Sequence, residues 1–340
     1  MSRSFLALCG VFCGATLATA HEVTELPACK ELKFAVSAVA LSPDGKTAAI
    51  STGGSRDGEI VFWDLDIGKS TGTIPQNKNH YTADCYRADG KYLYAYDRNG
   101  KVVVLDVKTS AVVKSLPARV SFGVLTTDPA GKRLGASVPY ESITVWDLEN
   151  DKVLMKIDRN RAQVYNRDAF NRDLTLLALA HYDEFDLLEV PGQKVVATFG
   201  EHRGQIQRIA FSPDDKLVAS ASQYRDHREN LEFGQIKIWD IAARREKTTL
   251  PRVDGFIRSL DFRPDGKQIV YTVLRDFPRQ RYLTDLYAHD LETGKTKLIF
   301  EIPASNPQPK VMHRLDGSML VFVHQGEELR IFAIREAGKG

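Results

Sequence analysis

The chain has 340 residues, of which 43% are hydrophobic and 26% are charged, with 46 Lys and Arg against 44 Asp and Glu. This composition is globular and excludes an intrinsically disordered chain. The formal net charge of +2 excludes a protein that coats nucleic acid, which needs a dense basic surface. Because single cores stop growing at roughly 250 residues, we expect two domains or one domain built from repeats.

The first twenty residues have the pattern of a secretory signal peptide. One positive charge, Arg3, precedes an apolar stretch over 5–17, and small residues follow at Ala18-Thr19-Ala20. This layout predicts cleavage before His21 and export to a periplasmic or extracellular location. An uncleaved membrane anchor is the alternative, although the stretch is short for a membrane span. No later apolar run approaches the roughly 20 residues of a membrane helix, so we expect no span in the mature chain.

A tight-turn motif recurs along residues 22–336. Its clearest copy is Ser42-Pro43-Asp44-Gly45, and successive copies are 41 to 51 residues apart. Proline presets such a turn, and glycine or aspartate tolerates the positive φ that it needs. The degenerate copies that we assign are 87–90, 128–131, 170–173, 212–215, 263–266 and 314–317. A period of this length, with turns between short apolar runs, indicates a repeat array.

Each turn is followed by two apolar runs, and the second run ends in a short signature. All three tryptophans of the chain, Trp63, Trp146 and Trp239, occupy this position. A further short run completes the unit, so each unit has four short strands and no helical pattern. Four strands per forty-odd residues is typical of a propeller blade. We therefore predict an all-β fold, a seven-bladed β-propeller with four antiparallel strands per blade, as one domain over residues 21–340.

The last unit lacks a fourth strand, because the chain runs out of apolar pattern near Ile334. An open blade would expose unpaired strand edges. Residues 22–28 resemble residues 113–118, which form the fourth run of the second unit. We therefore predict that the N-terminal strand is the outermost strand of the seventh blade and closes the ring.

These residues resemble the WD-repeat β-propeller family, and the resemblance covers residues 22–336. In such families a His, a Ser, an Asp and the Trp often form a hydrogen-bonded network inside a blade. The fifth unit matches with His202, Ser220 and Trp239, and no obvious Asp precedes the tryptophan. The first unit has Asp57 and Ser51 with its tryptophan but lacks the histidine.

Blades five and six have long connections between their second and third strands. The turn and the tryptophan-equivalent position are 24 and 23 residues apart there, against 15 to 18 in the other units. In a propeller these connections share one face with the loops that link blades. Both insertions are rich in arginine and aromatic residues, which dominate interaction hot spots. The candidate contact residues are Tyr224, Arg225, His227, Arg228, Arg275, Phe277, Arg279, Arg281 and Tyr282.

This surface predicts a protein partner, and an acidic protein surface or an anionic polymer would complement the arginines. The alternative is a pair of solvated hairpins whose Arg and Asp side chains satisfy one another. The sequence contains no Gly-x-Ser-x-Gly elbow, no His-Glu-x-x-His and no glycine-rich phosphate loop, so we expect a non-catalytic interaction platform without a cofactor. The alternative function is a propeller enzyme or ligand-binding protein with its site at the mouth of the central channel.

Two smaller features concern cysteine and metal chemistry. Cys85 falls in an innermost strand, where we expect it to be buried, and Cys29 falls in the loop that leaves the closing strand, so blade one separates them. This separation exceeds the spacing of a disulfide, and we predict two free thiols. The stretch 181–186 groups one histidine with three carboxylates, but alternation along a strand sends neighbours to opposite faces. We therefore predict no metal site.

Overall fold

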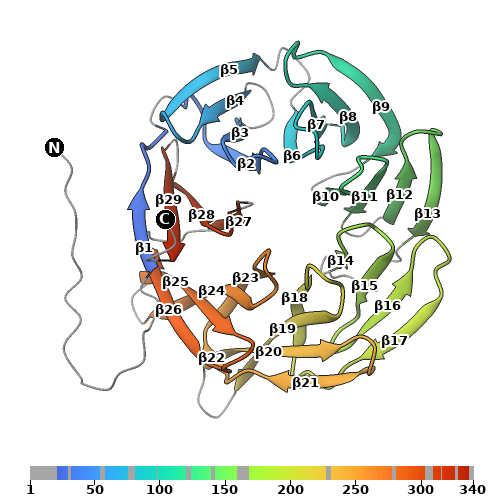
Figure 1. The fold of residues 1–340 in the computed structure, drawn as a ribbon, viewed down its shortest axis with the longest axis vertical. Coiled ribbons are helices and arrows are strands. Elements are labelled where there is room, and N and C mark those ends of the chain that lie inside the picture. The colour runs from blue at the N-terminus through green and yellow to red at the C-terminus, as the bar shows by residue number, and fades with distance from the viewer. Residues whose placement is uncertain are drawn as a thin grey trace.

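The strands form a closed ring of blades around a common axis (Figure 1). The computed structural model describes residues 21–29, 32–53, 58–75, 81–97, 99–119, 124–138, 142–158, 168–226, 231–277, 281–302, 309–314, 316–325 and 328–336. These residues form seven sheets, each with a path of four antiparallel strands. Within those ranges there is no helix, and so none that is long and apolar enough to cross a membrane. The prediction of an all-β, seven-bladed propeller is confirmed.

Each blade runs from an innermost strand beside the axis to an outermost strand on the rim. The innermost strands are β2 (Val36–Leu41), β6 (Thr82–Tyr86), β10 (Val124–Thr127), β14 (Ala169–Phe170), β18 (Gln205–Phe211), β23 (Phe256–Phe262) and β27 (Lys310–His313). The second strands are β3 (Thr47–Thr52), β7 (Tyr92–Tyr96), β11 (Arg133–Val138), β15 (Leu176–Ala180), β19 (Leu217–Asp226), β24 (Gln268–Phe277) and β28 (Met319–Gln325).

The remaining strands complete the blades toward the rim. The third strands are β4 (Glu59–Asp64), β8 (Lys101–Asp106), β12 (Ser142–Asp147), β16 (Phe185–Glu189), β20 (Leu231–Asp240), β25 (Arg281–Asp290) and β29 (Glu328–Glu336). The outermost strands are β5 (Lys69–Pro75), β9 (Val112–Arg119), β13 (Lys152–Asp158), β17 (Val195–Phe199), β21 (Arg245–Thr249), β26 (Thr296–Ile302) and, in blade seven, β1 (His21–Glu25). A short extra strand, β22 (Val253–Asp254), pairs with β20.

Blade seven is completed by the N-terminal strand, as predicted. β1 pairs antiparallel with β29, with Val23 opposite Ile334. The Leu26 N–H extends this pairing by donating to a β29 carbonyl over 2.9 Å. Glu25 forms an ion pair with Arg330 at 2.7 Å. In Figure 1 the blue N-terminal strand therefore lies beside the red C-terminal strand, and the two ends of the chain share one sheet.

The hydrophobic core is divided among the junctions between blades. Seven clusters of buried apolar side chains fill these junctions. Between blades seven and one, Val61 and Trp63 of β4 belong to the same cluster as Phe322 and Ile331 of β28 and β29. Neighbouring blades cover both faces of the middle strands of each sheet. This explains why residues 60–63 of β4 are all buried, instead of alternating between buried and exposed.

Most predicted turns are where the repeat placed them, but the turn of blade four is one residue later. It spans 171–174 instead of 170–173, because the Leu174 N–H donates to the Asn171 carbonyl over 3.2 Å. Leu174 has a φ of 57° and occupies the place that glycine holds in other turns. Its side chain is fully buried, so packing offsets the cost of the left-handed backbone.

Side chains of one turn lie over the turn of the next blade. A Cβ added to Gly131 would lie 2.7 Å from the stem of Arg87, and one added to Gly45 would lie 2.8 Å from the stem of Arg314. Glycine is therefore needed at these positions for space as well as for positive φ. We call the side of the ring that bears these turns the turn face, and the opposite side the hairpin face.

Cys29 and Cys85, the two cysteines of residues 21–340, are both thiols and are not joined by a disulfide, as predicted. Cys29 is fully buried, and its backbone forms an isolated antiparallel β-bridge with Leu329 of β29. Cys85 lies in the innermost strand β6 and is half-buried, whereas we expected full burial. Desolvation raises the pKa of the Cys85 thiol well above its usual value, so this side chain is unreactive at neutral pH.

Candidate protein-interaction face

Blade five contains the hydrogen-bonded network that its sequence predicted. The Trp239 indole N–H donates to Ser220 Oγ over 2.7 Å, and Ser220 Oγ lies 2.6 Å from His202 Nε2. Burial, with a contribution from Lys237, lowers the pKa of His202 to about 3, so the ring is neutral. His202 Nδ1 finds no partner among the described residues, which agrees with the missing aspartate.

The other two tryptophans lack this network. Leu134 pairs with Trp146 as Val218 pairs with Trp239, so Ala136 occupies the place of Ser220 in blade three. Within the described ranges the Trp146 indole N–H consequently has no acceptor.

Ser51 of blade one, noted in the sequence beside Trp63, does not occupy the position of the network serine. The position equivalent to Ser220 is Ile50, because Ala48 is the residue paired with Trp63. Ser51 lies one residue further along β3, on the other side of the strand. Its Oγ accepts the Ala83 N–H over 2.8 Å and so links blade one to blade two. Asp57 lies outside the described residues.

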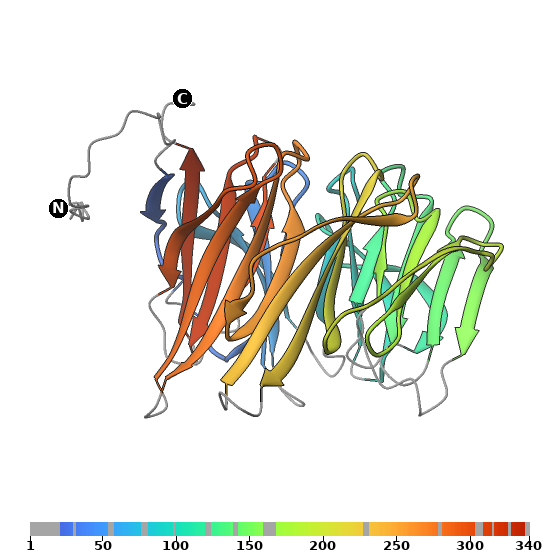
Figure 2. The same cartoon turned by 90° about the horizontal axis from the view of Figure 1, so that it is seen from below.

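The insertions of blades five and six are extended two-stranded ladders. β19 pairs with β20 from Leu217–Asp240 to Asp226–Leu231, and β24 pairs with β25 over ten residue pairs. Both hairpins project to the same side of the ring (Figure 2). The predicted clustering of the two insertions on one face, in adjacent blades, is therefore confirmed.

The hairpin of blade five presents a stack of aromatic and arginine side chains. The rings of Tyr224 and Phe233 are 5.7 Å apart, and the Arg252 guanidinium lies 4.1 Å from the centre of the Phe233 ring. β22 holds the Arg252 loop in place by pairing with β20. Arg225 is exposed, with its Nε 3.9 Å from Glu232 Oε1. Cation–π stacking of this kind holds an arginine side chain in one orientation.

The hairpin of blade six uses its first arginine internally. Arg275 forms an ion pair with Asp285, which is fully buried. Asp285 also accepts the Tyr287 hydroxyl over 3.1 Å, and Tyr287 stacks on Tyr271 at 5.5 Å. For Arg275 the alternative of internal Arg–Asp pairing therefore holds, and this residue supports the hairpin.

The remaining candidates are described in part or not at all. Phe277, Arg281 and Tyr282 lie in the β24–β25 ladder, and only their backbone is described. His227, Arg228 and Arg279 lie outside the described residues. The structure adds two residues that the sequence did not single out, Leu231 and Leu283, whose side chains are 49% and 41% exposed on the two hairpins. An apolar residue in a strand predicts burial, so only the three-dimensional ladder reveals them.

Two side chains of the stretch 181–186 in blade four, His181 and Asp186, contact each other. His181 Nε2 lies 2.9 Å from Asp186 Oδ2, and the Thr198 hydroxyl donates to the same carboxylate over 2.6 Å. Across the described parts of the chain, no group of three or more histidine, cysteine or carboxylate side chains could hold a metal ion.

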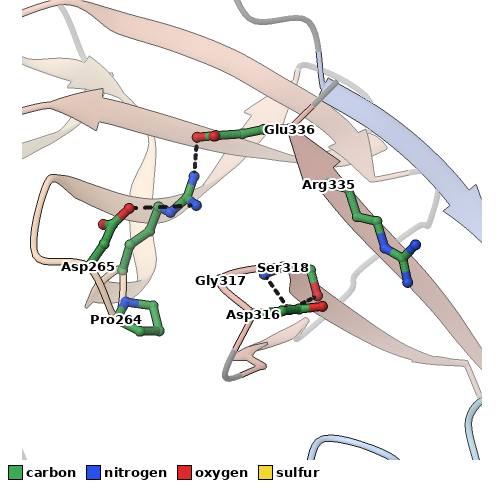
Figure 3. A pocket seen from close by; sticks show the side chains of 8 residues that line it. Pro264, Asp265, Asp316, Gly317, Ser318, Arg335 and Glu336 are labelled. Atoms are coloured by element: carbon green, nitrogen blue, oxygen red, sulfur yellow. Dashed lines mark hydrogen bonds and ion pairs between the residues drawn. The ribbon is translucent and has the colours of Figure 1, made fainter. Parts of the chain in front are cut away.

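A pocket of about 420 Å³ lies on the turn face between blades six and seven (Figure 3). Its charged groups are largely engaged with one another. Arg263 Nη1 lies 2.5 Å from Glu336 Oε1, and the Ser318 hydroxyl donates to Asp316 over 2.6 Å. This pocket therefore forms part of the seam that joins the last two blades.

Comparison with known proteins agrees with this architecture. The profile of the WD domain, G-beta repeat, matches residues 23–64 and 193–228. The chain is 28% identical over 211 residues to Periodic tryptophan protein 2 of Arabidopsis thaliana, covering 61% of this chain and 22% of that protein. It is 30% identical over 146 residues to the uncharacterized WD repeat-containing protein sll1491 of Synechocystis, covering 43% of this chain and 39% of that protein. The aligned regions thus span less than half of each relative.

The first matched segment begins in β1 of blade seven and ends with Trp63-Asp64 of blade one. The sequence repeat is therefore offset by one strand from the structural blade, which is the arrangement that closes the ring. The matched repeats and the WD-repeat relatives support a WD-repeat β-propeller family for this chain.

Proposed function

We propose that this protein is an exported, non-catalytic interaction platform that binds a protein partner with the hairpin face of blades five and six. Proteins of this family are typically protein-interaction scaffolds. The observation that supports the choice of face is the pair of adjacent long hairpins, with the Tyr224–Phe233–Arg252 stack on the hairpin of blade five and exposed leucines on both hairpins. A partner surface that carries both carboxylates and apolar side chains would complement this face.

The physical basis is preorganisation. A guanidinium stacked on an aromatic ring loses little further freedom on binding, and arginine and tyrosine are enriched among interface hot spots. Leu231 and Leu283 supply apolar area beside the charges, so a partner can bury surface around each ion pair. Removal of water strengthens those pairs.

Site-specific photo-crosslinking in the native host tests the face. A photoreactive phenylalanine analogue at Leu231 or Leu283 should give a discrete adduct with one protein, and Arg252→Glu should abolish it. The matched control is Ile67, which is 61% exposed in a turn of blade one. Equal adducts at Ile67, or adducts that Arg252→Glu leaves unchanged, would contradict the proposal.

Export is supported by the pattern of residues 1–20, in which a positive charge, an apolar stretch and small residues precede His21. N-terminal sequencing of protein recovered from the native host should give His21 as the first residue, in a periplasmic or secreted fraction. Recovery of Met1 in a membrane fraction would support the anchor instead.

A further inference from the structure

A second cavity on the turn face lies between blades two and three, on the opposite side of the ring from the long hairpins. It has a volume of about 410 Å³. Residues of blade two, from its turn and from β7, β8 and β9, form one wall. The other wall is formed by two turns of blade three, one after β10 and one after β12.

A row of directly paired residues crosses the wall of blade two. Tyr94 of β7 is opposite Val104 of β8, and Val104 is opposite Lys114 of β9, so the three side chains share one face of the sheet. Tyr92 lies two residues before Tyr94 and is on the same face. Val113, at the rim, is 51% exposed and also lines the cavity. The wall therefore changes from aromatic near the ring axis to aliphatic and cationic at the rim.

Tyr94 distinguishes this junction from the other six. It is the second residue after Tyr92, whose carbonyl accepts the hydrogen bond that closes the turn. The matching residues in the other blades are smaller: Ala49, Gly135, Ala178, Ala219, Val270 and Leu320. Tyr94 is fully buried and packs in one cluster with Leu125 and Leu134 of blade three. An aromatic ring therefore stands between these two blades where the others have a smaller side chain, and the cavity lies beside it.

The lining of the cavity carries more positive than negative charge. It contains three cations, Arg87, Lys114 and Lys132, against the carboxylate of Glu149. Lys132 Nζ lies 3.3 Å from Glu149 Oε1, but both side chains are more than half exposed, and such a pair contributes little to stability. An anion that enters the cavity can therefore bind Lys132 at little cost.

Arg87 is held in place while part of its guanidinium remains unused. The group lies 4.3 Å from the centre of the Tyr92 ring. Its Nε and Nη2 donate to Asp89, and its Nη1 has no acceptor among the residues that the structure describes. Lys114 forms an ion pair with Asp151. Neither Asp89 nor Asp151 lines the cavity, so these two carboxylates compensate the cations from outside it.

We propose that this cavity binds a small carboxylate with an apolar body. The carboxylate accepts hydrogen bonds from Lys132 and Arg87, and the body packs on Tyr92, Val113 and Leu148. The volume is at the lower end of small-ligand sites, and apolar walls with a few charged groups are typical of them. The same chemistry is offered by a free organic acid and by a glutamate next to an aromatic residue in a peptide.

Calorimetric titration of the full chain at about pH 7 and low salt, where the probe carboxylate is ionised and little screened, tests the proposal. The probes are 4-phenylbutyrate, the neutral 4-phenylbutan-1-ol, 4-phenylbutylammonium and the peptide acetyl-Phe-Glu-amide. We expect phenylbutyrate to bind at least about tenfold more tightly than the alcohol, which lacks the charge, and the ammonium to bind most weakly. Phenylbutyrate binding without peptide binding identifies a free acid as the ligand, and equal binding of the peptide identifies a protein segment.

Two variants should change the affinity in opposite directions. Lys132→Gln removes a cation of the lining and should weaken phenylbutyrate binding about fivefold. Glu149→Gln removes the carboxylate that competes for Lys132 and should tighten binding by about the same factor. The matched control is Lys216→Gln, since Lys216 has the same turn position in blade five, pairs with Asp214 at 3.0 Å and should leave binding unchanged.

All three substituted side chains are exposed, so the variants should fold, and thermal midpoints check this. The comparison of probes on the unaltered protein stands without them. Absence of phenylbutyrate binding, binding of the alcohol as tight as that of the carboxylate, or equal effects of Lys132→Gln and Lys216→Gln overturn the proposal.

Discussion

Blades five and seven reach the same four-stranded form by different means. Blade five is one continuous segment with an internal network of His202, Ser220 and Trp239 and a ten-residue hairpin ladder. Blade seven has no tryptophan and is assembled from the two ends of the chain, with β1 as its outermost strand. Stability inside blade five therefore depends on local contacts, whereas blade seven depends on a contact between segments about 300 residues apart in the sequence.

The largest effect is expected from removing the closing strand. Deletion of residues 21–28 should lower the thermal midpoint strongly, because it exposes the edge of β29 and uncovers the apolar cluster that Val23 packs against. Deletion of residues 337–340, beyond the end of β29, should cost little. Thermal denaturation of the two truncated proteins measures the difference. An unchanged midpoint after deletion of 21–28 would show that blade seven is stable as three strands.

Acidic pH should lower the free energy of unfolding through one buried histidine in each of these blades, His202 in blade five and His313 in blade seven. The folded pKa values of His202 and His313 are lowered to about 3 and about 4, so below about pH 6.5 the unfolded chain takes up protons that the folded chain does not. Stability is then lost as the pH falls, by up to about 2 kcal/mol per histidine at about pH 5. Asp261 acts in the opposite direction between about pH 6 and 4, because its folded pKa is raised.

Urea denaturation at about pH 7 and about pH 5 measures this loss. His202→Gln and His313→Gln should each reduce the difference in unfolding free energy between the two pH values, whatever their effect at neutral pH. A difference equal to that of the unaltered protein in both variants would assign the acid sensitivity to other groups.

The seam between blades seven and one should be sensitive to a single methyl group. Gly45→Ala places a Cβ 2.8 Å from the stem of Arg314 at a φ of 70°, and we expect a loss of about 1–3 kcal/mol. Gly294 has a φ of 67° but nothing within 4 Å of an added Cβ, so Gly294→Ala should cost only the backbone part of that effect. Equal losses in urea denaturation would mean that Arg314 moves aside without cost.

Loss of the hydrogen-bonded network of blade five should have an effect of similar size. Ser220→Ala leaves the Trp239 indole and His202 without partners, and we expect a loss of about 1–3 kcal/mol in unfolding free energy. The reverse change in blade three, Ala136→Ser, offers an acceptor to the unpaired Trp146 indole and should be neutral or stabilising. Destabilisation of equal size by both changes would show that packing, not hydrogen bonding, governs this position.

The repeat made the ring, the blade count and its closure predictable from the sequence, because turns and tryptophans recur at positions that blade geometry fixes. The features that were missed are those in which a side chain acts outside its own repeat. Leu174 replaces a turn glycine because its side chain is buried, and Ser51 bonds to the next blade. Arg275 forms an ion pair with Asp285 of the neighbouring strand, and no local sequence pattern predicts that these two side chains meet.

The pairing of β1 with β29 also has a consequence for how the molecule reaches its native state. His21 and Glu336 are partners in one ladder, so the ring cannot be complete until the last strand has emerged from the ribosome. Contacts of such long sequence separation form slowly, because a large loop must close before any of them is gained. The chain therefore remains an open, unclosed array throughout its synthesis, and closure of the ring is a late kinetic step for which both ends must be free at the same time.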